Sequence, residues 1–168
     1  MSGVTKERDF WAATVILVST IFLTIATIIH WLNIGFLVGP FRLNHWFVLI
    51  GTLYIAFAVP IIAILKRRNP NRIGTLFRLH VFGNLFAFLL ISLHFAGQIS
   101  RPAERYPDLG SGLVLYIAMI LLVSTGFLQR FRLIPKIKPQ TYRFVHTGSA
   151  LVFYLIIVVH VLHGLGIL

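Results

Sequence analysis

Four of the seven histidines in this sequence form a regular pattern. His80 and His94 are 14 residues apart, and His146 and His160 are separated by the same interval. At about 100° per residue, 14 helical residues return to nearly the same face, with an axial separation of ~21 Å. If both segments are helices, each presents two imidazoles on one side, at two depths.

Paired imidazoles on facing helices can hold a six-coordinate haem iron and leave no open position for a substrate. The chain contains no cysteine, which excludes thioether-attached haem c and thiolate-held iron–sulfur clusters. A lone membrane histidine is more often hydrogen-bonded between helices than bound to iron. The two equal spacings favour ligation by all four, and predict two haem b groups held by His80 with His146 and by His94 with His160.

Small and aromatic residues near these histidines could help to seat the haems. The pattern His-x-x-Gly occurs at both His80–Gly83 and His94–Gly97, and glycine lets a porphyrin plane approach a helix backbone. Glycine packs membrane helices equally well, so each one alone is weak evidence. Phe153 lies halfway between the histidines of its segment, where packing is the simpler role and an electron path the weaker hypothesis.

Three arginines are candidates for binding haem propionates. Arg78 lies two residues before His80, and Arg143 lies three residues before His146. Arg101 lies seven residues after His94. Guanidinium groups bind carboxylates through paired hydrogen bonds. Arginines beside a cytoplasmic loop also orient membrane helices, so Arg78 and Arg143 can serve both roles.

The other histidines, His30, His45 and His163, all fall towards one predicted membrane face. They could form a metal or quinol site, but their spacing repeats no ligand pattern, and hydrogen bonding at the interface is the favoured role. His163 is the alternative to His160 as an axial ligand.

Composition determines the environment in which these residues act. Hydrophobic residues make up 58% of the 168 residues and charged residues only 11%, which predicts an integral membrane protein. The formal charge of +11 would suggest nucleic acid as the partner of a soluble protein, but here the basic residues lie in short loops. Membrane lipid is the expected partner, and nucleic acid is not.

The predicted fold is all-α, a five-transmembrane-helix bundle in a single domain, residues 1–168, that encloses two haems. A hydrocarbon core of ~30 Å requires about 20 helical residues. Five apolar runs meet this length, at about 10–32, 45–65, 76–99, 112–128 and 142–165. Turn-forming residues separate them, and Pro60 is expected to kink the second helix.

The distribution of charge predicts the orientation of these helices. Twelve Lys and Arg lie before the first helix, between the second and third, or between the fourth and fifth, whereas three lie on the other side. The N-terminus is therefore expected in the cytoplasm and the C-terminus outside a plasma membrane. The third and fifth helices then run parallel, so His80 is level with His146 and His94 with His160.

Residues 77–97 and 142–164 resemble the haem helices of two families. Helix number and orientation are more similar to the transmembrane domain of ferric reductases and NADPH oxidases, whose parallel third and fifth helices carry such histidine pairs. The second resemblance is to cytochrome b of the quinol:cytochrome c oxidoreductases. The first resemblance implies axial ligation by His80, His94, His146 and His160. This sequence departs from that family because no sixth apolar run and no flavin or nicotinamide domain are expected in it. The resemblance therefore implies electron transfer through haems more strongly than it implies a reductase activity.

The expected function is transmembrane electron transfer, as the cytochrome b subunit of a larger oxidoreductase that exchanges electrons with quinol or a partner protein. A stand-alone ferric-reductase-like component is the first alternative. A proton or metal-ion transporter that uses membrane histidines as relay groups is an alternative from another class. The latter is disfavoured because all four Asp and Glu lie near the N-terminus or in one loop.

Overall fold

The computed structural model of the chain describes residues 3–102, 104, 110–164 and 166–167. Its backbone contacts divide the chain into two compact units, Met1–Pro107 (unit 1) and Asp108–Leu168 (unit 2). Most of the described residues are helical, as the sequence predicts. The single domain expected over residues 1–168 stays a prediction.

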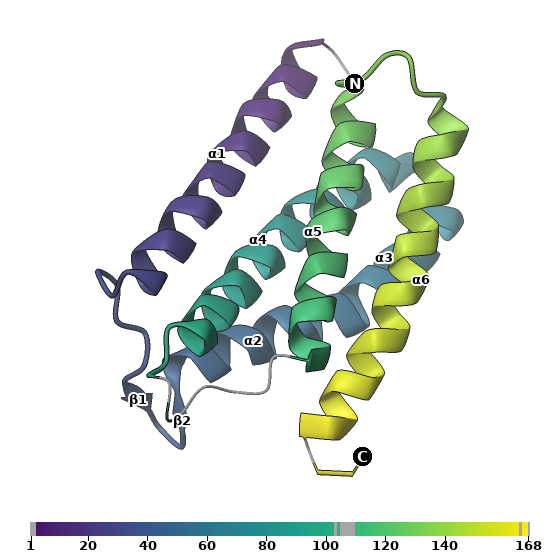
Figure 1. Ribbon diagram of the computed structural model, residues 1–168. Coiled ribbons are helices and arrows are strands. Elements are labelled where there is room, and N and C mark those ends of the chain that lie inside the picture. The colour runs from purple at the N-terminus through teal and green to yellow at the C-terminus, as the bar shows by residue number, and fades with distance from the viewer. Residues whose placement is uncertain (1–2, 103, 105–109, 165, 168) are drawn as a thin grey trace. The chain divides into compact units, whose positions relative to one another are not determined.

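Unit 1 contains three long helical segments and a small hairpin, which can be followed in Figure 1. The first segment is one helix, the second consists of two α-helices joined by a π-helical turn, and the third follows a short 3-10 turn. In chain order the elements are α1 Gly3–Ile28, β1 Leu37–Val38, β2 Phe41–Arg42, α2 Leu43–Leu53, η1 Tyr54–Ala58, α3 Val59–Arg68, η2 Pro70–Arg72 and α4 Ile73–Ile99.

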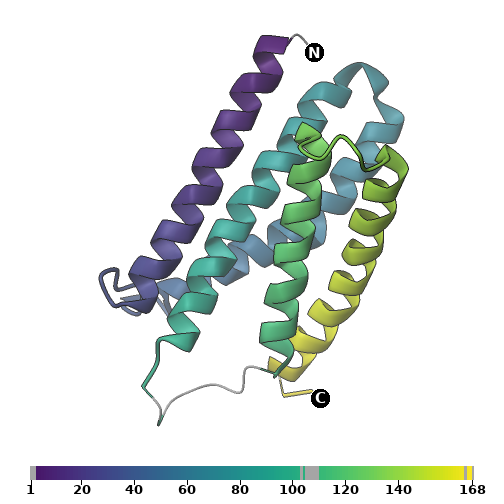
Figure 2. The ribbon, with the colours of Figure 1, turned by 45° about the horizontal axis from the view of Figure 1, so that its top comes forward.

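Unit 2 is a hairpin of two helices, α5 Gly110–Phe131 and α6 Pro139–Gly164. The two helices lie side by side and run in opposite directions (Figure 2). Arg132 ends α5 with a left-handed backbone conformation (φ 52°). Pro139 begins α6 at a position where its missing N–H costs no helical hydrogen bond.

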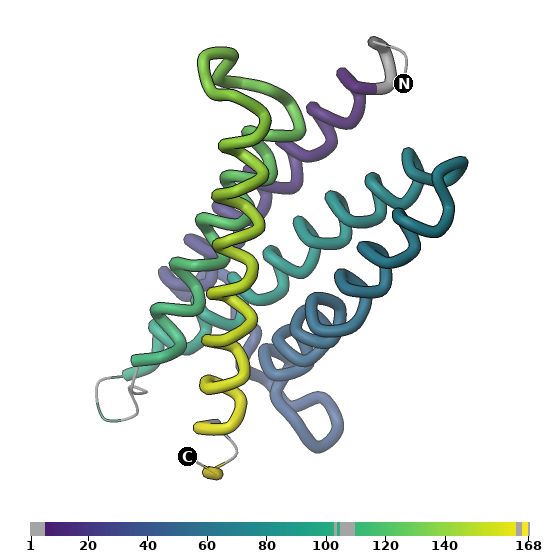
Figure 3. The backbone as a smooth tube through the Cα atoms, turned by 90° about the vertical axis from the view of Figure 1, so that its right-hand side faces the viewer, coloured from purple at the N-terminus to yellow at the C-terminus, as the bar shows by residue number. Residues whose placement is uncertain are grey.

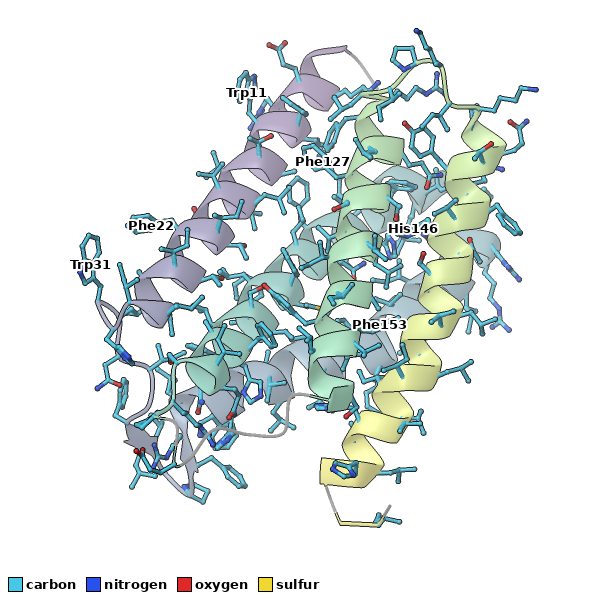
Figure 4. All side chains as sticks on the ribbon, viewed as in Figure 1. Trp11, Phe22, Trp31, Phe127, His146 and Phe153 are labelled. Atoms are coloured by element: carbon cyan, nitrogen blue, oxygen red, sulfur yellow. The ribbon has the colours of Figure 1, made fainter. Side chains whose placement is uncertain are left out.

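Among the residues that the structure describes, five helical segments are long and apolar enough to cross a membrane, which agrees with the predicted number. They cover Lys6–Ile28, Leu43–Arg68, Pro70–Ile99, Gly110–Phe131 and Pro139–His163. In lipid every backbone N–H and C=O must be bonded within the protein, and a continuous helix meets this requirement. Large apolar side chains remain exposed on these helices, for example Trp11 and Phe22 on α1, which point away from α4 (Figure 4).

The first helix ends four residues earlier than the predicted bound at residue 32. His30 has a left-handed conformation (φ 63°), and the Leu32 N–H donates to the Ala26 carbonyl at 3.0 Å. This hydrogen bond satisfies a carbonyl that the next helical turn would otherwise bond. The apolar run continues past this point, so hydropathy alone places the helix end too late.

The irregularity expected at Pro60 takes the form of a π-helical turn. Residues Tyr54–Ala58 are π-helical and come directly before α3, where Pro60 lies in the first turn. Proline cannot donate to the carbonyl four residues before it, and a wider turn is one way for a helix to accommodate the lost bond. The segment 43–68 still continues as one span.

Helix α4 packs against α1, α2 and α3 within unit 1, and Figure 3 shows its hairpin with α3. Its buried side chains are Leu85, Ala87, Phe88, Leu90, Ser92, Leu93 and Ala96. A Cβ at Gly51 of α2 would come within 2.9 Å of Ile91 Cγ1. The absence of a side chain at Gly51 therefore allows α2 to approach α4 closely. The helix that carries His80 and His94 is thus held by neighbours on several sides.

Candidate functional site

The four patterned histidines lie on two helices, His80 and His94 on α4 and His146 and His160 on α6. All four side chains are half-buried. Each has a hydrogen-bond partner at Nδ1, and these partners decide which ring nitrogen carries the proton. The state needed for axial ligation is a proton on Nδ1 and a lone pair on Nε2.

His94 is held in this state by backbone from the start of α2. Its Nδ1 lies 3.1 Å from the carbonyl oxygen of Asn44. A carbonyl oxygen can only accept, so Nδ1–H must be the donor. The proton is therefore on Nδ1, and Nε2 carries the lone pair that an iron would bind.

His146 is held by a hydroxyl group of α5. Its Nδ1 lies 3.1 Å from Thr125 Oγ1, and this hydroxyl donates its own proton to the Leu121 carbonyl at 2.7 Å. A hydroxyl has one proton, so towards His146 it can only accept. In this arrangement Nδ1–H of His146 is the donor, as it is in His94. Figure 4 shows the His146 ring between the two helices of unit 2.

His160 has an equivalent partner at the other end of the hairpin. Ser111 Oγ of α5 lies 3.0 Å from His160 Nδ1. Ser111 and Thr125 are 14 residues apart, which is the interval between His146 and His160. Because α5 and α6 are antiparallel, equal intervals place one hydroxyl beside each histidine.

A glycine follows each of these hydroxyl residues, and each faces the same imidazole. A Cβ at Gly126 would lie 3.1 Å from His146 Cε1, and a Cβ at Gly112 would lie 3.3 Å from His160 Cε1. Both contacts are tighter than side chains normally make, so glycine provides the room for each ring. In the sequence the signal is a hydroxyl residue followed by glycine, which occurs at Ser111-Gly112 and again 14 residues later at Thr125-Gly126. The spacing of the histidines alone does not reveal this repeat.

His80 has a different kind of partner. The side-chain amide Nδ2 of Asn84 donates to the His80 carbonyl at 2.7 Å and lies 3.2 Å from His80 Nδ1. An amide NH₂ group is a donor, so in this arrangement Nδ1 accepts and the proton is on Nε2. Iron ligation through Nε2 requires the proton to move to Nδ1 and the Asn84 amide to turn.

The predicted glycines of α4 lie against neighbouring side chains. A Cβ at Gly83 would overlap the ring of Tyr54, whose hydroxyl donates to the Leu79 carbonyl at 2.7 Å. A Cβ at Gly97 would lie 3.3 Å from the amide nitrogen of Asn44. Both glycines thus permit close packing inside unit 1. Their role beside a porphyrin stays a prediction.

The three predicted arginines lie in different surroundings. Arg78 forms a salt bridge with Asp9 of α1 at 2.9 Å, and Asp9 is only 6% exposed. Arg143 is exposed near the start of α6. Arg101 is half-buried just after α4 and lines a cavity described below. The pairing with Asp9 offers Arg78 a structural role that the sequence analysis did not include.

Phe153 is almost completely buried, with 1% of its surface exposed. It lies seven residues from both His146 and His160, at about the depth midway between them. Figure 4 shows Phe153 on α6, nearer the C-terminus than His146. Its burial is compatible with the packing role that the sequence favours, and the electron path stays a hypothesis.

The remaining histidines have separate surroundings. The ring of His45 is 5.9 Å from that of His94, centroid to centroid, His30 lines the cavity with Arg101, and His163 is exposed at the end of α6. Over residues 3–102, 104, 110–164 and 166–167, no group of three or more His, Asp or Glu side chains is arranged to hold a metal ion. The roles of these three histidines stay a prediction.

Comparison of the chain with protein families, with curated proteins and with solved structures gives no match.

Proposed function

We propose that this chain is a di-haem b membrane cytochrome, in which His80 and His146 ligate one haem and His94 and His160 the other. The observation that carries the proposal is the 14-residue interval, which occurs in the histidines of α4, in those of α6 and in the hydroxyl residues of α5. The interval in α5 follows from that in α6, because each hydroxyl is paired with one histidine, but packing alone gives no reason for the histidines of α4 and α6 to share one interval. Two haems at two depths give such a reason.

The protonation of the imidazoles supports axial ligation. In His94 and His146 the Nδ1 proton is donated to an oxygen acceptor, which leaves the lone pair on Nε2. Such a partner also orients the ring and increases the basicity of the ligating nitrogen. These two imidazoles therefore fit haem iron, which binds neutral imidazole, whereas His80 fits it once its proton has moved to Nδ1.

The chain's own residues would position the cofactor and control its surroundings. Bound haem supplies reversible one-electron chemistry. Thr125 and Ser111 hold the imidazoles of α6, Gly126 and Gly112 give them room, and the Asn44 carbonyl holds His94. Two histidines per iron leave no open position for a substrate, which is the arrangement of an electron carrier.

The position of the sites supports transfer between membrane faces. The two histidines of each helix are separated by ~21 Å along the axis, which spans much of a hydrocarbon core of ~30 Å. With the N-terminus in the cytoplasm, His80 and His146 serve the inner haem and His94 and His160 the outer haem. We propose membrane quinol or a partner protein as the electron donor, and a larger redox complex as the context.

The direct test is the haem content of the detergent-purified protein. We expect two haems per chain that are extracted completely into acidified organic solvent, with the absorption spectrum of low-spin bis-imidazole iron. A protein expressed with ample haem that binds one haem, or none, would contradict the proposal. Pigment that stays on the polypeptide after extraction would also contradict it, since the chain has no cysteine for thioether attachment.

A further inference from the structure

A cavity of about 310 Å³ lies at one end of unit 1, where α1 and α4 end and α2 begins. We call it the Asn44 cavity. Its polar lining includes Arg42, Asn44, Ser100, Arg101 and His30. The helix ends around the cavity are also the ends of predicted membrane spans, so the cavity is expected at the depth of the lipid headgroups.

The Asn44 cavity is lined by two cationic side chains, Arg42 and Arg101, and by no described anionic side chain. None of its lining residues carries a carboxylate, and no carboxylate among the described residues forms a salt bridge with Arg42 or Arg101. Two guanidinium groups at one small cavity favour an anionic ligand with oxygen acceptors. Phosphate presents several such oxygens in a compact group.

Asn44 supplies a second and independent observation. Asn44 is only 3% exposed, and its side-chain Oδ1 is buried without a hydrogen-bond partner. A buried acceptor without a donor is costly, so a group that fills the cavity and offers a proton to Oδ1 would be stabilised. The ligand therefore requires a hydrogen-bond donor in addition to its anionic oxygens.

We propose that the Asn44 cavity binds a phosphate group that carries or adjoins a hydroxyl. Arg42 and Arg101 would pair with the phosphate oxygens, and the hydroxyl would donate to Asn44 Oδ1. Two sources have this chemistry, the headgroup of a phosphoglycerol lipid and hydrogen phosphate from solution. Because Asn44 also accepts the Nδ1 proton of His94 through its backbone carbonyl, an occupied cavity would rigidify the support of that histidine.

The test measures ligand affinity of the full-length protein in neutral detergent, by thermal shift and native mass spectrometry. The probes are phosphatidylglycerol, phosphatidylcholine and inorganic phosphate. We expect phosphatidylglycerol to bind at least about tenfold more tightly than phosphatidylcholine, since loss of a charge-assisted hydrogen bond costs about this much. Arg42→Gln with Arg101→Gln, and separately Asn44→Leu, should each remove about a tenfold preference.

The control is Arg72→Gln, which removes the same charge from an exposed arginine at the other end of unit 1. It should leave the preference unchanged. Inorganic phosphate binding that depends on Arg42, Arg101 and Asn44 would support the proposal with solution phosphate as the source. Dependence seen only with phosphatidylglycerol would support it with lipid as the source. The double arginine variant retains Asn44, so it tests the site even if Asn44→Leu fails to fold.

Three outcomes would overturn the proposal. One is equal affinity for phosphatidylglycerol and phosphatidylcholine with no binding of inorganic phosphate. Another is an equal loss of affinity in Arg72→Gln, which would indicate general attraction of anions to a basic protein. The last is competition, in which added haem displaces phosphatidylglycerol from haem-free protein. That result would assign the cavity to haem propionates and leave the proposed electron transfer intact.

Discussion

The two nitrogens of each imidazole have different tasks at the proposed sites. Nδ1 fixes the ring, and Nε2 is the atom that an iron would bind. The acceptor for His94 is the backbone carbonyl of Asn44, and the acceptor for His146 is the hydroxyl of Thr125. Only the hydroxyl can be removed by substitution. Thr125 is therefore the residue at which the support of a ligand can be tested without touching the ligand itself.

Thr125→Val should weaken haem binding at the site that contains His146. Valine has nearly the shape of threonine but cannot accept the Nδ1 proton, and loss of such a partner typically costs about 10- to 100-fold in metal affinity. Titration of haem-free protein with haem would measure the change. Thr147→Val removes an exposed hydroxyl from α6, next to His146, and should leave affinity unchanged. Equal behaviour of the two variants would argue against the role of Thr125.

The pairing of the histidines predicts which substitutions have matching effects. His80→Ala and His146→Ala should remove or convert the same component of the haem spectrum, while His94→Ala and His160→Ala should affect the other. A single haem cannot connect histidines ~21 Å apart along a helix axis. Low-temperature difference spectra would separate the components. His163→Ala should preserve both, and loss of one component in that variant, with His160→Ala unchanged, would transfer the ligand role to His163.

At the scale of elements, α5 positions the histidines of α6 with a repeated pair of residues. The sequence predicted both helices within three residues at each end, because lipid requires continuous apolar segments, although α6 begins at Pro139 and not at residue 142. The sequence did not reveal the partners of His146 and His160. Hydroxyls at helix–helix contacts carry little signal in composition, and the antiparallel alignment that joins them depends on tertiary packing.

Gly126→Leu should displace the His146 ring and abolish the component that His146 ligates. A Cβ at this position would already lie 3.1 Å from the imidazole, and a leucine side chain has no space beside it. Gly148→Leu is the matched control, because nothing lies within 4 Å of a Cβ there. Electron paramagnetic resonance of the oxidised protein would report the loss of one bis-imidazole signal in Gly126→Leu alone. Retention of both signals would show that α5 does not restrain the ring.

At the scale of the whole molecule, hydropathy correctly predicted five helical segments long and apolar enough to span a membrane among the described residues, whereas local backbone chemistry modified their limits. The early end of α1 depends on the left-handed conformation of His30, and the π-helical turn before Pro60 depends on a missing N–H. The Asn44 cavity was also outside the reach of sequence analysis. It is formed by residues 27–44 and 97–102, two segments far apart in the sequence that no periodicity brings together.

The orientation of the spans is predicted by charge and can be measured directly. The chain has no cysteine, so single cysteines at Arg68, Lys136 and Pro102 would be the only labelling sites. All three positions are exposed. Arg68→Cys and Lys136→Cys should react with membrane-impermeant reagent only after permeabilisation, and Pro102→Cys in intact cells. The opposite accessibility would exchange the inner and outer haems.

The matching intervals in α5 and α6 restrict how this protein can change in length during evolution. An insertion between His146 and His160 would shift His160 away from Ser111 unless α5 gained the same number of residues between Gly112 and Thr125. A single-residue insertion would also rotate the later histidine by about 100° around the helix. We expect homologues to show insertions and deletions in these two segments together, or in neither.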